Sequence, residues 1–394
     1  MSRIMQRPIY TGIDVGSFQV KVVVAAPPET HDLPMSIVGT GSAPTRGMRH
    51  GYITDIKEVT QSIRDAVSRA SQSAKMPIKQ ARISIGGISL EELRSTGEVT
   101  LTTSGGLVTD RDIERALKES EKKAMSRLLN RTIIHTIPLA YRIDGAPIQG
   151  RAQGLQGTKL AVDTLLFSTL TQHHDDLIDA VEAAGIDVEG TMVSPLAASF
   201  VTLTKAQKTA GVLLANLGAE TFSLIVFDDN VPLSLKVLSV GSSDITNAIA
   251  LAFQLSLTEA EQLKRGAVTG SDIPQKKLTT LTHARLKTLF ESIDAHLKTI
   301  GRQRLLPAGI VITGGGAALA NIADEARATL KLPAQIGMPS SIPRLGSLDP
   351  TWTVAFGLCR WGFTEDSAAP IYSFGEILKR TWLSLWESIR SILP

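Results

Sequence analysis

The order of apolar and polar residues predicts that the chain opens with an α/β unit. Apolar runs at 9–13 and 20–25 flank the polar segment Asp14-Val15-Gly16-Ser17, which is typical of a β-hairpin. Residues 55–74 then repeat apolar side chains at helical spacing, and a strand is predicted at 81–86.

Residues 88–163 form a predicted unit of their own. This unit contains expected strands at 98–102, 132–137 and 160–166 and an expected helix at 110–129. Because helical patterning resumes at 172–184, we expect this small α+β unit to be an insertion rather than an appended domain.

The pattern of the opening hairpin returns later in the chain. Residues 212–215 and 221–227 are apolar and flank Asn216-Leu217-Gly218. A single echo at a distance of about 200 residues indicates two related lobes, because solenoid repeats recur every ~20–50 residues. Beyond it, 244–306 is mostly helical in pattern, and a predicted strand that starts at Gly309 ends in three glycines.

Composition narrows the class of protein. The chain has 394 residues, 43% of them hydrophobic and 20% charged, which fits two or three folded units and excludes an intrinsically disordered protein. The single cysteine, Cys359, and a start without a signal-peptide core predict a reducing cytoplasm. No window reaches the ~18 apolar residues of a membrane span. The net charge of +3 is too small to indicate a nucleic-acid partner.

Three glycine-containing motifs carry candidate phosphate chemistry. In the first hairpin, Gly16 lets backbone amides approach phosphate oxygens, Ser17 adds a hydroxyl, and Asp14 can hold a hydrated Mg²⁺. An ordinary tight turn explains one such hexamer equally well, but 216–221 repeats the acceptor, glycine and hydroxyl layout. The glycines 314–316 follow a strand, where adenosine can lie against bare backbone. Together the motifs predict a polyphosphate clamped between two hairpins.

These motifs, with a connecting helix after Ser194-Pro195-Leu196-Ala197-Ala198, resemble those of the actin-like ATPase superfamily. Within it the chain resembles the FtsA family of bacterial cell-division actin homologues over nearly its whole length. The matching segments are Gly47 with 51–55, 135–138 with Tyr141 and 144–145, 240–241 with 244–246, and 258–264.

The resemblance implies an α/β, actin-like (ribonuclease H-like) two-lobed fold with an inserted subdomain 1C and a C-terminal amphipathic helix. The expected parts are subdomain 1A at 1–87 and 164–208, 1C at 88–163, 2A at 209–243 and 308–343, 2B at 244–307, a return to 1A at 344–363, a linker at 364–373 and the helix at 374–394.

The resemblance also implies that the cofactors are ATP and Mg²⁺. The implied nucleotide-binding residues are Asp14, which also holds the metal, Gly16, Ser17, Phe18, Lys21, Asn216, Gly218, Thr221, Glu261, Lys264, Gly314, Gly315 and Gly316. A solvated helix face is the alternative for Glu261 and Lys264. The second motif commonly begins with Asp, so Asn216 removes a negative charge near the metal and predicts weak hydrolysis at most. Ser194 stands where many relatives have an acidic residue, which also predicts weak hydrolysis.

Segment 245–307 holds nine basic against five acidic residues. A solvated helical face explains this excess, but in the FtsA family this subdomain receives the acidic C-terminal tail of the tubulin homologue FtsZ. By this resemblance Arg285 and Lys287 are the expected contacts of that tail.

The last segment is amphipathic at helical spacing. Its apolar face holds Phe374, Leu378, Trp382, Leu385, Trp386 and Ile389. Two tryptophans on such a face favour the surface of an anionic phospholipid membrane. The alternative is a helix that packs on the body of the protein or on a partner.

The predicted function is that of an ATP-binding actin-like cell-division protein. By the resemblance, it is expected to polymerise on the cytoplasmic face of the membrane at the midcell septum, to anchor the FtsZ ring and to contact late division membrane proteins. One alternative is a small-molecule kinase of the same superfamily, for which we identify no catalytic base. Another is a PilM-type pilus-assembly adaptor, which is not expected to carry the subdomain around 135–138 or an amphipathic tail.

Overall fold

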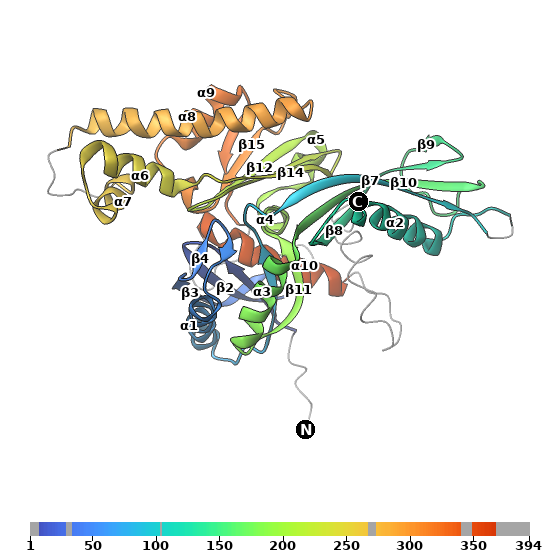
Figure 1. Cartoon of the computed structure of the whole chain (residues 1–394), viewed down its shortest axis with the longest axis horizontal. Helices are drawn as coiled ribbons and strands as arrows, with labels where there is room; N and C mark the ends of the chain where they lie inside the picture. Colours follow the sequence, from blue (N-terminus) through green and yellow to red (C-terminus); the bar gives the residue numbers. More distant parts are fainter. Residues whose placement is uncertain (1–7, 29–33, 103–104, 267–272, 340–348, 368–394) are drawn as a thin grey trace.

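The computed structural model describes residues 8–28, 34–102, 105–266, 273–339 and 349–367, and these build two lobes and an inserted unit (Figure 1). Each of the three has its own main sheet, of five, five and four strands. The inserted unit, in teal, extends to one side of the lobes. The predicted α/β architecture of two lobes with an inserted unit is confirmed.

The first lobe is a sheet in the order β11-β6-β1-β2-β3, with β1, β2 and β3 antiparallel and β6 and β11 parallel to β1. Its strands are β1 Tyr10–Val15, β2 Gln19–Ala26, β3 Ser36–Pro44, β6 Gln80–Ile85 and β11 Asp187–Val193, and its helices are α1 Ile56–Ala74 and α3 Thr171–Ala183. Gly41 lets α1 lie directly on β3, since a Cβ there would come within 2.2 Å of the Ala66 carbonyl oxygen.

The second lobe repeats this topology, in the order β14-β13-β12-β15-β16. Its strands are β12 Val212–Leu217, β13 Phe222–Asp228, β14 Val231–Leu238, β15 Ile310–Thr313 and β16 Ala334–Ile336. Its helices are α6 Ser242–Phe253, α7 Leu257–Lys264, α8 Gln275–Thr299 and α9 Ile322–Leu330. The echo in the sequence therefore reflects a repeated fold, as predicted.

The inserted unit is an antiparallel sheet in the order β7-β10-β8-β9 with helix α2 packed on it. Its elements are β7 Glu91–Thr100, α2 Asp110–Met125, β8 Arg131–Ile143, β9 Ala146–Ile148 and β10 Lys159–Leu170. Strands β8 and β10 are longer than predicted, because irregularities of register at Asp163/Thr164 and Phe167/Ser168 interrupt the alternation that marks a strand. Strand β7 begins at Glu91 and ends at Thr100, so the strand predicted at 98–102 was placed too late. Helix α2 is shorter than predicted and ends at Met125.

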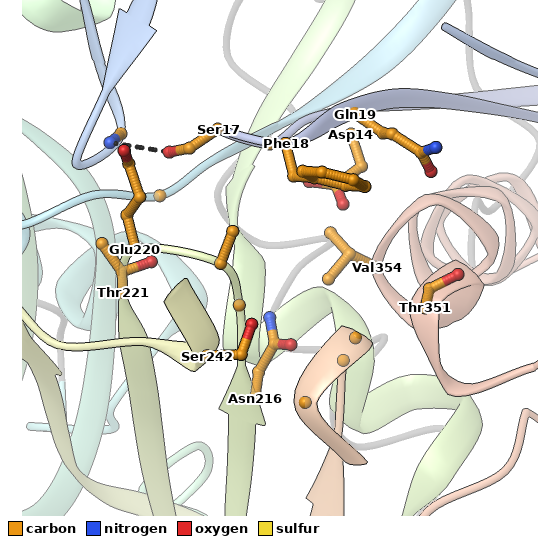
Figure 2. Close-up of a pocket in the computed structure, with 18 of the residues that line it drawn as sticks. Asp14, Ser17, Phe18, Gln19, Asn216, Glu220, Thr221, Ser242, Thr351 and Val354 are labelled. Carbon is orange, nitrogen blue, oxygen red and sulfur yellow. Dashed lines mark hydrogen bonds between the residues drawn. The ribbon is translucent and has the colours of Figure 1, made fainter. Parts of the chain in front are cut away.

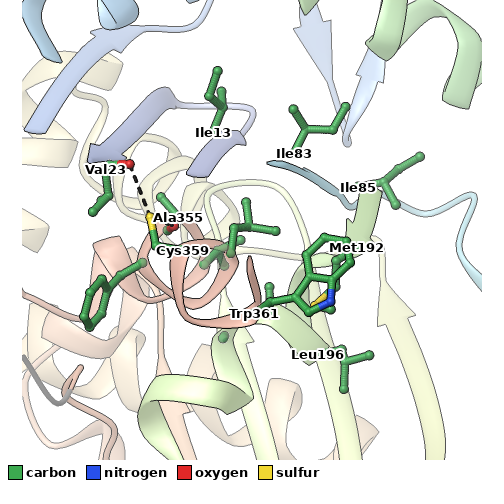
Figure 3. Close-up of a cluster of buried hydrophobic side chains, with 14 of the residues drawn as sticks. Ile13, Val23, Ile83, Ile85, Met192, Leu196, Ala355, Cys359 and Trp361 are labelled. Carbon is green, nitrogen blue, oxygen red and sulfur yellow. Dashed lines mark hydrogen bonds between the residues drawn. The ribbon is translucent and has the colours of Figure 1, made fainter. Parts of the chain in front are cut away.

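Two buried helices, α4 Ser194–Thr202 and α10 Thr353–Ser367, cross beneath the sheet of the first lobe (Figure 3). Gly357 lets them touch, since a Cβ there would lie 1.9 Å from the Ala197 carbonyl oxygen. Cys359 packs in this core and donates from Sγ to the Val23 carbonyl over 3.3 Å.

Helix α10 continues to Ser367, so the predicted linker at 364–373 begins too early. The error arose because Thr364, Glu365 and Asp366 are polar, although Thr364 is buried. The predicted amphipathic helix at 374–394 lies outside the described residues. Among the helices that the structure describes, none is long and apolar enough to cross a membrane.

Candidate functional site

The two glycine hairpins end in turns of the same geometry. Between β1 and β2, the Gly16 amide donates to the Gln19 carbonyl over 3.2 Å, and between β12 and β13 the Gly218 amide donates to the Thr221 carbonyl over 2.9 Å. The acceptor is three residues after the glycine in both turns. The two turns face each other across a cleft between the lobes, as Figure 2 shows for side chains of both motifs.

This cleft holds a cavity of about 470 Å³, within the range of small-ligand sites. All the predicted nucleotide-binding residues line it: Asp14, Gly16, Ser17, Phe18, Lys21, Asn216, Gly218, Thr221, Glu261, Lys264, Gly314, Gly315 and Gly316. Segments some 300 residues apart in the sequence thus meet in one place.

Asp14 and Lys21 lie opposite each other in neighbouring strands on the wall of the cavity. They are partners in the β1–β2 register, and Asp14 also accepts a 2.6 Å hydrogen bond from the Ser84 hydroxyl. Burial raises the pKa of Asp14, against the opposing effects of Ser84 and Lys21. Burial likewise lowers the pKa of Lys21, against the attraction of Asp14 and Asp349. A cation bound near Asp14 would favour its ionised form.

The third motif lies at the end of β15. The chain turns at Gly314, where φ is +84°, and continues into a short 3₁₀ helix at Gly315–Ala318. The Thr313 hydroxyl contacts the Pro350 carbonyl at 3.1 Å and the Thr353 hydroxyl at 3.0 Å. These contacts tie the glycine turn to the start of α10, so the motif is held by both lobes.

Glu261 and Lys264 contact each other on α7, with Nζ 2.6 Å from Oε2. Lys264 also donates to the Ser242 carbonyl and the Thr246 hydroxyl. Burial favours the neutral form of Glu261, but hydrogen bonds from Lys264, Thr246 and Arg265 outweigh it and lower the pKa. Their surroundings are a polar cluster at the cavity and not a solvated helix face.

Sequence reasoning missed several residues that line the cavity: Ser84, Glu220, Ser242, Ser243, Arg265, Asp349 and Thr351. The Ser242 and Ser243 amides donate to the Gly218 and Ala219 carbonyls over 2.9 and 2.8 Å, so the start of α6 rests on the second hairpin. Of these residues, Glu220 lies inside the second motif, so its position in the sequence could have identified it.

Arg285 and Lys287 lie on α8, away from this cavity. Both are exposed, and residues two apart on a helix do not face each other. Lys287 lines a separate groove with Glu291, Asp294 and Glu325, and its Nζ is 3.9 Å from Glu291 Oε1. The surroundings of Lys287 are thus more acidic than the composition of 245–307 indicates.

Comparison with known families finds two matches in this chain. The family model described as "Cell division protein FtsA" matches residues 213–357, and the model described as "SHS2 domain inserted in FTSA" matches residues 87–168. The first lies mainly on the second lobe, and the second on the inserted unit.

Relatives named "Cell division protein FtsA" match most of the chain. The one from Borreliella burgdorferi is 28% identical and covers 90% of this chain and 91% of its own length. The one from Bacillus subtilis is 26% identical over 90% of this chain and 83% of its own length. The one from Escherichia coli is 24% identical over 92% of both.

Solved structures share the fold at low identity. A chain of the "PilM-PilN type IV pilus biogenesis complex" superposes with a TM-score of 0.70 and 19% identity, over 90% of this chain and 98% of that one. "Glycerol dehydratase reactivase" has a TM-score of 0.53 and 10% identity, over 90% of this chain and 100% of that one. The pilus protein covers 90% of this chain, and the uncovered tenth is shorter than segment 88–163. The match must therefore include part of the inserted unit. The inserted unit therefore does not separate this chain from PilM-type proteins, contrary to expectation.

Proposed function

This chain belongs to the FtsA family of cell division proteins, and we propose that it binds ATP with Mg²⁺ in the cleft between its lobes. The observation that carries the proposal is that two turns of the same geometry and a glycine turn border one cavity. Backbone amides at such turns are suited to phosphate oxygens.

The residues around the cavity fit such a ligand. A Cβ built on Gly315 would meet nothing closer than Thr351 Cγ2 at 3.9 Å, so this backbone faces open space that a nucleoside can fill. Glu261 and Lys264 offer an acceptor and a donor to the sugar, and the hairpin turns hold the phosphates. Asp14 would hold the hydrated Mg²⁺, whose charge offsets that of the phosphates.

We propose that hydrolysis is slow. Asn216 stands at the end of β12 and offers the metal shell a neutral oxygen, whereas a carboxylate there would add a charge. Ser194, at the start of α4, also lines the cavity with a neutral side chain. Binding and exchange of the nucleotide, more than its turnover, would then control the protein.

We further propose that the protein polymerises on the cytoplasmic face of the membrane at the division site and anchors the FtsZ ring. The apolar pattern of 374–394 supports attachment to anionic lipid, and the family relationship supports filaments and the FtsZ tail as partner. Arg285 and Lys287 on α8 remain the proposed contacts for that tail. Late division membrane proteins are the proposed partners of the inserted unit.

A small-molecule kinase needs a base between the lobes to accept a proton from its substrate. Each carboxylate that the structure describes at the cavity already has a polar partner: Ser84 for Asp14, the His50 amide for Glu220, Lys264 for Glu261 and Thr351 for Asp349. The observations favour a nucleotide-controlled protein over a kinase.

Negative-stain imaging of the full chain with Mg-ATP on an anionic lipid monolayer tests the proposal. Membrane-bound filaments are expected with ATP and not without it. A chain that binds ATP in solution but leaves the monolayer bare would refute the membrane role. Phosphorylation of a sugar or other small molecule would favour the kinase.

A further inference from the structure

A loop of the first lobe, residues 47–53, touches both hairpin turns; we name it the bridging loop. Its Gly51 amide donates to the Ser17 hydroxyl over 3.1 Å, which fastens it to the first hairpin. Its His50 amide donates to Glu220 Oε2 over 2.5 Å, and His50 Nδ1 lies 3.2 Å from the Glu220 carbonyl oxygen, which fastens it to the second. Figure 2 shows Glu220 reaching from the second hairpin toward Ser17.

The same loop also contacts the chain that enters the inserted unit. The Ile88 amide donates to the His50 carbonyl over 3.3 Å, three residues before β7 begins. Gly51 packs on Gly87, where a Cβ on Gly51 would come within 2.2 Å of the Gly87 Cα. A displacement of His50 must therefore move the root of the inserted unit or break its contact.

The inserted unit touches the second lobe at another place. Glu92 accepts hydrogen bonds from the Leu235 amide at 2.5 Å and the Ser234 hydroxyl at 3.0 Å. Arg94 donates to the Leu233 carbonyl over 3.0 Å. Since β14 is an edge strand, these side chains satisfy backbone groups that no strand pairs. The inserted unit is thus held at its root by the bridging loop and along β7 by the second lobe.

We propose that Glu220 is a positioning residue that links nucleotide binding to the orientation of the inserted unit through His50 and Ile88. This inference rests on the proposed binding of ATP in the cleft and names how that site is regulated. With the cleft empty, Glu220 holds the bridging loop across the two hairpins and fixes the root of the inserted unit. With ATP bound, the loop is released.

The charges give the direction of the change. Glu220 and the proposed phosphate-binding turns border the same cavity, so bound phosphate places negative charge near the carboxylate that holds the loop. This repulsion favours the released loop, and a ligand shifts a conformational equilibrium only through such differential interactions.

Hydrogen exchange of peptides that span 86–91, measured beside a fluorescent ATP titration of the full chain, tests this link. In the wild type, ATP should raise exchange in this segment. Glu220→Ala removes the acceptor, so exchange should be about tenfold faster without ATP and should not rise further with it. Glu220→Gln keeps an acceptor but removes the charge, so exchange should stay slow and respond less to ATP.

Glu220→Ala should bind ATP more tightly than the wild type, because opening the loop no longer opposes binding and the carboxylate no longer repels the phosphates. Glu220→Gln should bind more tightly for the second reason alone. Glu182→Ala, an exposed glutamate on α3, is the matched control and should behave as the wild type. If Glu220→Ala misfolds, Glu220→Gln still tests the link, since it keeps an acceptor for the His50 amide but should respond less to ATP.

The two proposals fail in different ways. A wild type that binds ATP while exchange at 86–91 stays unchanged overturns the link alone. Glu220→Ala that keeps the wild-type response to ATP also overturns it. A wild type that does not bind ATP in the titration overturns the proposed site, and the link with it.

Discussion

The side-chain oxygen of Asn216 lies against the backbone of Gly314, where a Cβ on the glycine would come within 2.3 Å of it. Asn216 lies one residue before the end of β12, and Gly314 directly follows β15, the parallel neighbour whose register pairs Thr313 with Asn216. With φ at +84°, Gly314 is also in a conformation that other residues rarely adopt. The second phosphate motif and the glycine turn therefore pack as one surface.

Adding a side chain at Gly315 should block the nucleotide without harming the fold. The valine side chain of Gly315→Val would point into the open space of the cavity. ATP affinity in a fluorescent titration should therefore fall at least about tenfold, or about 1.4 kcal/mol. The free energy of unfolding should change by less than about 1 kcal/mol. Gly314→Ala is the comparison, because its Cβ meets Asn216 and its backbone is strained, and it should destabilise the protein. Unchanged affinity in Gly315→Val would refute the assigned site.

Much of this surface could be predicted from the sequence, because hairpins and glycine turns are local patterns. The three motifs, the repeated lobes and the inserted unit all follow from such patterns. Asp349 could not be predicted, because it enters the cavity only through the packing of α10 on β1. Contacts such as His50 with Glu220 join residues 170 positions apart and leave no periodic trace. The ends of long strands were missed where bulges break the alternation.

Restoring a carboxylate in the second motif should speed hydrolysis. The aspartate side chain has nearly the same shape as asparagine, so Asn216→Asp retains the packing against Gly314 and adds a negative charge near the proposed metal. Phosphate release at saturating Mg-ATP should rise about tenfold, within the range of changes around a metal's ligands. Asn321→Asp, which adds a carboxylate at an exposed position outside the cavity, is the control and should leave the rate unchanged. No increase in Asn216→Asp would show that another part of the site limits hydrolysis.

The ionisation of Lys208 makes the free energy of unfolding depend on pH. It lies on α5 Lys205–Ala210 with Nζ 5.3 Å from the Phe200 ring centroid and 4.9 Å from that of Phe227. The rings favour the ammonium, but burial is the larger effect and lowers the pKa to about 7 from 10.5. Above pH 7 the unfolded chain binds more protons at this lysine than the folded one, so stability should rise with pH up to 10.5.

Urea unfolding at pH 7 and pH 9 measures this effect. Over that interval the free energy of unfolding of the wild type should rise by about 2 kcal/mol more than that of Lys208→Met, since each pH unit contributes up to ~1.4 kcal/mol. Lys205→Met, on the same helix but less buried, should follow the wild type. Parallel curves for the wild type and Lys208→Met would contradict the lowered pKa.

Reversing the charge at Lys287 should weaken binding of an FtsZ tail peptide less than reversing it at Arg285. Lys287 already lies beside Glu291, Asp294 and Glu325, which oppose an acidic peptide. Arg285→Glu should lower affinity about tenfold, and the double reversal should abolish binding, because like charges at an interface cost several kcal/mol. Fluorescence anisotropy with labelled peptide measures this, and ATP binding is the control for folding. Normal peptide binding by the double variant would move the contact to another surface.

Attachment to lipid should depend more on apolar insertion than on charge. Residues 374–394 carry three basic and two acidic side chains, and each basic residue near an anionic surface contributes only about 1 kcal/mol. Trp386→Glu should therefore release the chain from anionic vesicles in co-sedimentation, whereas added salt should weaken the wild type only in part. A filament presents many copies of this segment, and multivalency can raise affinity by ~10²–10⁴. A polymerisation-defective variant should thus pellet less than the wild type, and Arg390→Gln, on the charged face, should pellet nearly as well. If Trp386→Glu pellets as fully as the wild type, the segment is not the anchor, and packing on the body or on a partner becomes the better account of its apolar face.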